Sequence, residues 1–216
     1  MTYSVKEAFY TLQGEGAQTG RAAVFLRFAG CNLWSGLERD RAKAVCTFCD
    51  TDFVGTDGEN GGKYRTPAEV AGLVASIWKV NAGVAAGRPY VVCTGGEPLL
   101  QLDPPLIAAL HAAGFEIAVE TNGTVEAPAG LDWICVSPKA NAELKLKRGH
   151  ELKLVYPQAE PEAQPERFTE LDFQHFFLQP KDDPEAARNV QAAAEYCLKN
   201  PQWRLSLQTH KLTGLP

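Results

Sequence analysis

The sequence predicts an α/β protein built on a partial, reduced TIM-like barrel of mostly parallel strands. Short apolar runs rich in β-branched residues recur along the 216 residues, and helix-like stretches separate several of them. Such alternation is typical of parallel sheets, which lie open or close into a barrel. A complete eight-fold barrel usually needs about 250 residues, so we expect a barrel in which helices are missing or shortened.

The predicted strands are short apolar runs bounded by turn-forming residues. They cover 23–28, 90–93, 116–119, 133–136, 151–155, 175–178 and 204–207. Helices are predicted over 66–80, 104–113 and 184–198, because apolar residues recur there at helical spacing. The first helix begins with Thr66 and Glu69 in a capping-box spacing. We expect a glycine-rich loop over 55–62, and a loop or the approach to a short helix over 156–167.

A polar turn follows several of these predicted strands. The turns are RFAGC at 27–31, TGGE at 94–97, ETNG at 120–123, SPK at 137–139 and QPKD at 179–182. One such turn would be explained by capping alone. Because the carboxyl ends of parallel strands lie on the same face, we expect these turns to converge on one ligand.

Composition excludes several classes of function. The net charge of -5 argues against a nucleic-acid-binding surface, and the basic cluster of Lys145, Lys147 and Arg148 is interpreted as a solvated face. Residues 1–5 lack the layout of a signal peptide, and no apolar run approaches the length of a membrane span. We expect a soluble, cytoplasmic protein with a single domain over 1–216.

Three cysteines crowd one stretch of the chain, with Cys31, Cys46 and Cys49 in a C-x14-C-x2-C spacing. Structural zinc sites use four protein ligands, whereas three thiolates leave an open position for chemistry. A cubane iron-sulfur cluster held by three cysteines leaves one iron free for another ligand. The spacing alone favours a cluster over zinc only slightly. Cys93, Cys135 and Cys197 lie in apolar segments and are predicted to be buried core thiols.

Several motifs in this order carry a resemblance to a known family. They are FYTLQGEG at 9–16, FLR at 25–27, GCNL at 30–33, CTFCDT at 46–51, TGGEP at 94–98, ETNG at 120–123 and SPK at 137–139. Together they resemble the radical S-adenosylmethionine enzymes and, within them, the 7-carboxy-7-deazaguanine synthase family of queuosine and deazapurine biosynthesis. The superfamily pattern is C-x3-C-x2-C, so residues 34–45 form an insertion that resembles the expanded cluster loop of some members.

The resemblance implies a radical S-adenosylmethionine core and a specific reaction. Cys31, Cys46 and Cys49 would hold a four-iron four-sulfur cluster whose open iron binds S-adenosylmethionine. The resulting 5'-deoxyadenosyl radical would abstract hydrogen from C6 of 6-carboxy-5,6,7,8-tetrahydropterin. Ring contraction and loss of ammonia would then give 7-carboxy-7-deazaguanine, which makes the protein a carbon-nitrogen lyase.

The resemblance also implies which residues bind S-adenosylmethionine. They are Phe48, Gly95, Gly96, Glu97, Ser137, Pro138, Lys139, Gln179, Pro180, Lys181 and Asp182. Glycines let backbone approach the methionine moiety, and a carboxylate such as that of Glu97 accepts from its ammonium group. The alternatives are a simple glycine turn and, for Lys139, a solvated surface lysine.

The implied substrate-binding residues are Leu12, Gln13, Gly14, Glu15, Arg27, Thr94, His210 and Pro216. A guanidinium at a strand end can grip the pterin carboxylate, although a structural salt bridge explains Arg27 equally well. The carboxylate of Pro216 would accept from the amino edge of the pterin. Thr51 matches the magnesium site of the family, with substrate oxygens and waters completing the octahedron.

Two other functions stay open at the level of sequence. A radical-generating activase would use the same cluster on a partner polypeptide, and a zinc-binding interaction module would need only the C-x-x-C pair. The family also implies an electron donor such as flavodoxin or ferredoxin, and a homodimer.

Overall fold

The computed structural model describes residues 2–82 and 87–216, and within them the strands form one sheet of nine. The sheet has the order β3-β1-β2-β4-β5-β6-β7-β8-β9. From β2 onward along this order each strand runs parallel to its neighbour, whereas β1 is antiparallel to both β2 and β3. The strands are β1 (Tyr3–Leu12), β2 (Ala22–Phe28), β3 (Gly62–Tyr64), β4 (Tyr90–Gly95), β5 (Glu116–Thr121), β6 (Trp133–Val136), β7 (Arg148–Tyr156), β8 (Asp172–Pro180) and β9 (Trp203–Leu205).

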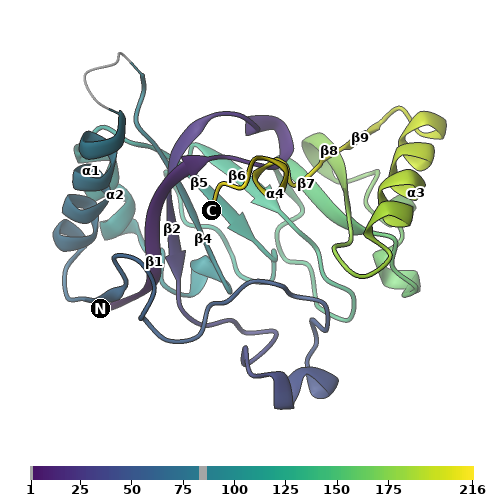
Figure 1. Cartoon of the computed structure of the whole chain (residues 1–216), viewed down its shortest axis with the longest axis horizontal. Helices are drawn as coiled ribbons and strands as arrows, with labels where there is room; N and C mark the ends of the chain where they lie inside the picture. The colour runs from purple at the N-terminus through teal and green to yellow at the C-terminus, as the bar shows by residue number, and fades with distance from the viewer. Residues whose placement is uncertain (1, 83–86) are drawn as a thin grey trace.

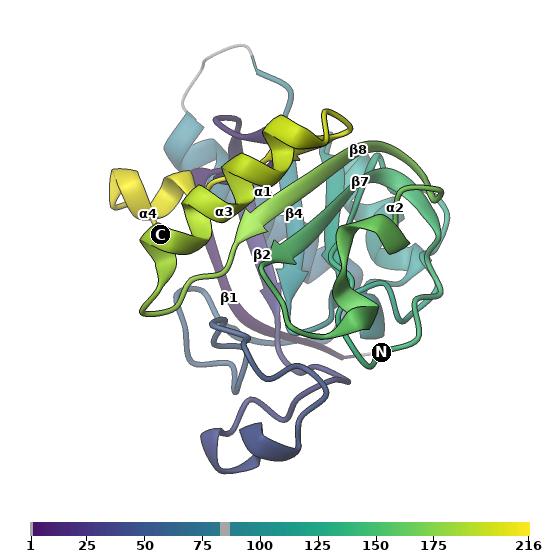
Figure 2. The ribbon, with the colours of Figure 1, turned by 90° about the vertical axis from the view of Figure 1, so that its right-hand side faces the viewer.

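Helices cover the two ends of this sheet (Figure 1). α1 (Pro67–Ala82) and α2 (Pro104–Ala112) pack side by side, α1 against β1 and β2 and α2 against β5. α3 (Ala186–Lys199) packs on β8 and β9 at the other end of the sheet (Figure 2). In residues 116–156, all of which are described, no α-helix joins β5 to β6 or β6 to β7. The prediction of a mostly parallel, reduced barrel with missing helices is confirmed.

The two faces of the sheet differ in chemistry because side chains alternate along each strand. The helix-facing side holds the main core, in which Leu26, Cys93 and Val119 pack against helix residues such as Leu106. The opposite face, called the inner face below, begins with the small buried cluster of Ala23, Tyr90, Val92 and Ala118. Farther along the same strands it turns polar, and this polar end holds the site.

Helix starts follow the sequence signals. The Thr66 hydroxyl accepts from the Glu69 N–H at 3.2 Å, as the capping-box spacing predicts. The Glu69 carboxylate accepts from the N–H of Arg65 at 2.6 Å, one residue before the N-cap, where a capping box would use the N–H of Thr66. Asp103 caps α2 by accepting from the Leu106 N–H at 3.1 Å. These caps satisfy backbone N–H groups in the first turns of α1 and α2.

The prediction missed three elements: β1, β3 and α4 (Thr209–Thr213). A bulge between Val5 and Glu7 breaks the alternation of β1, so buried residues occur next to one another and the period-two signal disappears. β3 begins at Gly62, within the stretch predicted as a loop. Residues 156–167 contain two short 3-10 helices, Pro161–Ala163 and Pro165–Arg167.

Other sequence interpretations can be compared directly. Cys93 and Cys135 are buried as predicted, but Cys197 is only half-buried, because it lies on the side of α3 that packs at the edge of the core. Lys145, Lys147 and Arg148 are exposed, which agrees with a solvated face. Among the described residues, no helix has the length and apolarity to cross a membrane. The single domain over 1–216 stays a prediction.

Candidate active site

A cavity of about 420 Å³ opens at the carboxyl ends of the parallel strands. The polar turns after β2, β4, β6 and β8 contribute to its wall, together with the end of β1 and the C-terminal tail. Every residue that the sequence analysis proposed for cluster, cofactor, substrate and magnesium lines this cavity, except Glu97 and Pro138. The expected convergence of the turns is therefore present.

The three cysteines reach the cavity from two segments. Cys31 follows β2, whereas Cys46 and Cys49 lie in an irregular loop. The Cys46 thiol donates a hydrogen bond to Cys49, and this bond together with burial raises the pKa of Cys46. The same hydrogen bond lowers the pKa of Cys49 to about 6. Burial raises the pKa of Cys31. In the part of the chain that the structure describes, no three Cys, His, Asp or Glu side chains form a group that could hold a metal ion.

The chemistry of this wall nevertheless fits an iron-sulfur cluster. Cys31, Cys46 and Cys49 present three thiols to one cavity, and thiolates are the protein ligands that such clusters use. Lys139 lies beside them, with its Nζ donating to the backbone oxygen and hydroxyl of Ser137 at 2.8 and 2.6 Å. Burial lowers the pKa of Lys139, while Cys46 and Cys49 act to raise it. A half-buried ammonium without a carboxylate partner among the described residues favours an anionic group next to it.

Gly95 and Gly96 allow the chain at the end of β4 to pack closely against the backbone that leads to Cys31. Gly95 has a φ of 140°, and a Cβ there would overlap the carbonyl oxygen of Phe28. A Cβ on Gly96 would overlap the carbonyl oxygen of Gly30 and come within 2.7 Å of the Cys31 Cβ. Both glycines line the cavity, so they combine close backbone packing with access to a ligand.

Glu97 has a different position from the one expected. Its side chain is fully buried and lies behind the cavity wall. The carboxylate accepts from the N–H of Leu99 at 3.0 Å, the hydroxyl of Thr121 at 2.8 Å and the N–H of Asn122 at 2.8 Å. Burial raises the pKa of Glu97, and the hydrogen bonds from Asn122 and Leu99 oppose that shift. Glu97 therefore ties the end of β4 to the end of β5.

Arg27 is paired within the cavity. Its Nε donates to the Glu7 Oε1 at 2.8 Å, and both side chains line the wall. The salt bridge that sequence reasoning offered as an alternative is thus present. It occupies the Nε of a guanidinium that carries five N–H groups.

A buried ammonium that sequence reasoning missed lies deeper on the inner face. Lys153 of β7 contacts the carboxylate of Glu15, and its Nζ is 3.6 Å from the Glu120 Oε1. Burial acts to lower the pKa of Lys153, but the carboxylates of Glu120 and Glu15 outweigh it and hold that pKa well above the usual value. Polar residues Glu151 and Lys153 alternate with leucines in the sequence, a pattern that could have identified one polar face of this strand.

Glutamines connect this group to the rest of the wall. The Gln13 Nε2 donates to the Glu120 Oε1 at 3.0 Å. Gln179 and Gln208 both donate to the Glu15 Oε1, at 3.1 and 3.0 Å. Glu15 therefore joins the end of β1 to β8 and to the tail.

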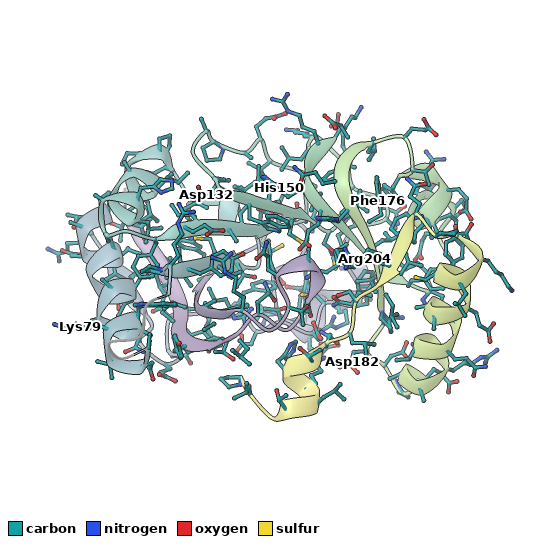
Figure 3. The ribbon with its side chains drawn as sticks, turned by 90° about the horizontal axis from the view of Figure 1, so that it is seen from above. Lys79, Asp132, His150, Phe176, Asp182 and Arg204 are labelled. Atoms are coloured by element: carbon teal, nitrogen blue, oxygen red, sulfur yellow. The ribbon has the colours of Figure 1, made fainter. Side chains whose placement is uncertain are left out.

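The C-terminal tail folds back over the site, with α4 in front of the middle of the sheet (Figure 1). The Thr209 N–H and hydroxyl each donate to the Gly14 carbonyl at 3.0 Å. Lys211 donates to Asp50 at 3.1 Å and contacts Asp182, which lies beside α4 in the view of Figure 3. His210 and Pro216 line the cavity. The tail is thus one wall of the site.

The magnesium candidate Thr51 lines the cavity between Asp50 and Asp52. Asp52 pairs with Lys6 at 2.8 Å, and Asp50 pairs with Lys211 at 3.1 Å. The hydrogen bond from Lys6 lowers the pKa of Asp52. Both flanking carboxylates therefore have cationic partners of their own.

Comparison with known proteins gives full-length relatives, although no family model matches the chain. The chain is 65% identical over 219 residues to 7-carboxy-7-deazaguanine synthase of Caulobacter vibrioides, with 100% of each chain covered. It is 62% identical over 216 residues to 7-carboxy-7-deazaguanine synthase of Bordetella pertussis, again with 100% of each covered. The crystal structure of QueE from Escherichia coli matches with a TM-score of 0.68 and 30% identity, over 96% of this chain and 94% of that one. The chain therefore belongs to the 7-carboxy-7-deazaguanine synthase family.

Proposed function

We propose that this chain converts 6-carboxy-5,6,7,8-tetrahydropterin into 7-carboxy-7-deazaguanine with loss of ammonia, in the biosynthesis of the queuosine precursor. The single observation that carries the proposal is the cavity, which is lined by three cysteines together with the end of β1 and the folded-back tail. Full-length identity of 65% to a synthase of that name supports the same reaction.

Cys31, Cys46 and Cys49 are the proposed ligands of a four-iron four-sulfur cluster with one open iron for S-adenosylmethionine. When bound, these cofactors supply a carbon radical that can remove a hydrogen atom from C6 of the pterin. The contribution of the protein is to orient that C–H bond and to exclude water from the cavity.

The cofactor side of the cavity comprises Phe48, the glycine pair and the turns after β6 and β8. Phe48 is the proposed stacking surface for adenine, and the Lys181 Nζ is 6.0 Å from its ring centre. Ser137 and Lys139 offer a hydroxyl and a cation to the polar groups of the cofactor. For Glu97 we now propose a supporting role, because its oxygens already accept from Leu99 and from the end of β5.

The substrate side comprises β1, Arg27 and the tail. The guanidinium of Arg27 would hold the pterin carboxylate, with Glu7 fixing its orientation. Gln13 and Glu15, with the backbone at Leu12 and Gly14, would read the edge of the ring. Thr94 from β4 and His210 with the Pro216 carboxylate from the tail would complete the pocket, and Thr51 would contribute to a magnesium ion.

Anaerobic reconstitution followed by turnover tests this function. Protein purified without oxygen should carry about four iron and four sulfide per chain and, with S-adenosylmethionine, a reductant and magnesium, should form 7-carboxy-7-deazaguanine and ammonia. Stoichiometric zinc in place of iron, or reductive cleavage of the cofactor with no product from the pterin, would reject the assignment. An electron donor such as flavodoxin or ferredoxin, a homodimer and a cytoplasmic location stay predictions.

A further inference from the structure

The insertion over 34–45 leaves and re-enters the cysteine loop at one point. The carbonyl of Leu33 accepts from the N–H of Val45 at 3.0 Å and from the N–H of Cys46 at 3.4 Å. The chain on either side of the insertion is therefore brought together at Leu33. The long spacing between Cys31 and Cys46 is shortened in space, and both cysteines line the same cavity.

The loop that carries Cys46 and Cys49 has little regular structure to hold its shape. Residues 44–53 belong to no helix or strand. Regular elements fix backbone conformation by repeated hydrogen bonds, and a loop without them depends on individual contacts. The backbone around the two cysteines therefore depends on side-chain donors that bind its carbonyl groups.

Arg41 makes those contacts from within the insertion. Its guanidinium donates through Nη1 to the carbonyl of Thr47 at 3.0 Å and to the carbonyl of Cys49 at 3.1 Å. Through Nε it donates to both oxygens of Glu38, at 2.9 and 2.8 Å. One side chain thus joins the 3-10 helix Glu38–Lys43 to the backbone on both sides of Phe48.

The guanidinium of Arg41 is itself held in place by stacking. It lies 4.1 Å from the ring centre of Trp34, and Trp34 packs edge-on against Phe53 with ring centres 5.5 Å apart. Trp34 is buried, and its Nε1 donates to the Leu37 carbonyl at 3.3 Å. A planar guanidinium can stack on an aromatic face and donate in its own plane at the same time, which an ammonium cannot do.

Arg39 lies two residues away on the same 3-10 helix and provides a comparison. Its side chain is 80% exposed and its one ion pair, with Asp40, has an N–O distance of 4.0 Å. The Arg41 side chain is 28% exposed. The two residues carry the same charge on the same element, but among the hydrogen bonds of the described residues only those of Arg41 reach the segment between Cys46 and Cys49.

From this geometry we propose that Arg41 is a positioning residue for the cysteine loop, and that the insertion serves as a support that fixes the backbone around Cys46 and Cys49. The inference rests on the proposed function, since it assumes that these cysteines hold the cluster. Arg41 acts through two backbone carbonyls and is not among the residues that line the cavity. Removal of the Arg41 side chain should speed the release of iron from the cluster without changing the stability of the fold.

The test compares Arg41→Ala with the matched variant Arg39→Ala in the anaerobically reconstituted protein. The readout is the rate of iron release to a chelator, followed by absorbance of the iron complex. Loss of charge-assisted hydrogen bonds to two carbonyls should make release roughly ten-fold faster in Arg41→Ala, and Arg39→Ala should match the wild type. Arg41→Lys, which keeps the charge but not the planar fork, should release iron nearly as fast as Arg41→Ala.

Two further measurements separate a local from a global effect. The thermal midpoint of the metal-free protein should be the same in Arg41→Ala and Arg39→Ala, and added guanidinium ion at millimolar concentration should slow iron release from Arg41→Ala alone. Equal release from both alanine variants would overturn the role of Arg41 while leaving the cluster assignment intact. A wild type that binds no iron would instead reject the proposed function.

Discussion

The Thr11 hydroxyl donates to the backbone oxygen of Pro216 at 3.0 Å, which joins β1 to the last residue of the chain. This hydrogen bond places the terminal carboxyl group at the wall of the cavity, where Pro216 and its neighbours on β1 meet. The proposed part of the tail in substrate recognition depends on this position.

Extension of the chain beyond Pro216 by two glycines should impair substrate recognition alone. A lost charge-assisted hydrogen bond costs about 1.5–3 kcal/mol, so kcat/KM for the pterin should fall roughly ten- to a hundred-fold. Iron content and binding of S-adenosylmethionine should be unchanged, because the cluster wall is untouched. Steady-state kinetics with calorimetric cofactor binding checks this. Wild-type kinetics in the extended protein would show that the tail is only a structural cover.

Replacement of Lys153 by Gln should destabilise the protein strongly. The carboxylates of Glu15 and Glu120 would then face each other without the ammonium that separates them. Breaking a buried pair in this way costs about 3–5 kcal/mol, measured as the free energy of unfolding in urea. The exposed Lys145→Gln should change it by less than about 0.5 kcal/mol. Similar stability of the two variants would argue that Lys153 is not needed to balance these charges.

Each of Cys31→Ala, Cys46→Ala and Cys49→Ala should abolish turnover and lower the iron content of reconstituted protein. Each change removes one of the three proposed ligands and leaves the cluster with a second open iron. Cys197→Ala is the matched control, because that thiol lies on α3 and is only half-buried. Full turnover by any of the three ligand variants would refute the ligand set.

Removal of divalent metal should slow turnover of the pterin more than it weakens binding of S-adenosylmethionine, since the proposed ion touches the substrate. Thr51→Ala should reproduce this effect in the presence of magnesium. Thr47→Ala is the control from the same loop, because its side chain is exposed. Product formation rates and cofactor binding isotherms, with and without chelator, distinguish the cases. Turnover that survives thorough chelation would exclude the magnesium site.

The ion pair between Arg21 and Glu116 should make stability depend on acid pH. The two side chains form paired hydrogen bonds of 2.8 and 2.7 Å on the inner face. The hydrogen bond from Arg21 lowers the pKa of Glu116 below its ordinary value of 4.5. A lowered carboxyl pKa stabilises the fold above the unfolded-state value, and this contribution is lost as pH falls through the folded-state pKa.

Urea unfolding at several pH values measures this contribution. Glu116→Gln should lose about 1–2 kcal/mol at pH 7, and this loss should shrink as pH falls through the lowered folded-state pKa, below which the wild-type carboxyl group is protonated in both states. The exposed Glu170→Gln should follow the wild type at every pH. A difference between wild type and Glu116→Gln that stays constant with pH would contradict the assigned shift.

Much of the fold could be predicted because its signals are local. The runs at 133–136 and 116–119 match β6 and the start of β5, and the spacing of apolar residues identified α1. β1 was not predicted because its bulge interrupts the alternation of buried and exposed side chains, so that neighbouring residues are both buried. α4 was not predicted because five residues are too few to show the helical spacing of apolar residues. Its position depends on contacts with Gly14 and Asp182.

The candidate site, like the fold, could be predicted from the sequence only in part. Nearly all of the residues that the sequence assigned to the site line the cavity, but the wall also holds residues that it did not assign, such as Glu7, Glu120 and Lys153. Arg41 does not stand out in sequence, because an arginine in a charged segment is most often solvated. For Lys153 the alternation with leucines indicates a polar face of the strand, but it does not show that this face is buried. The ammonium of Lys153 is buried because strands distant in sequence bring carboxylates to it.

The sequence by itself therefore determined the fold class, the family and the set of chemical groups available to the site, since these depend on local periodicity and on motif order. Only the tertiary structure decided which of those groups face the cavity. Glu97 lies behind the cavity wall because three hydrogen-bond donors near the ends of β4 and β5 satisfy its carboxylate. The tail lies at the cavity because it forms hydrogen bonds with Thr11 and Gly14. Such partners are set by contacts between residues far apart in the chain, which no local pattern encodes.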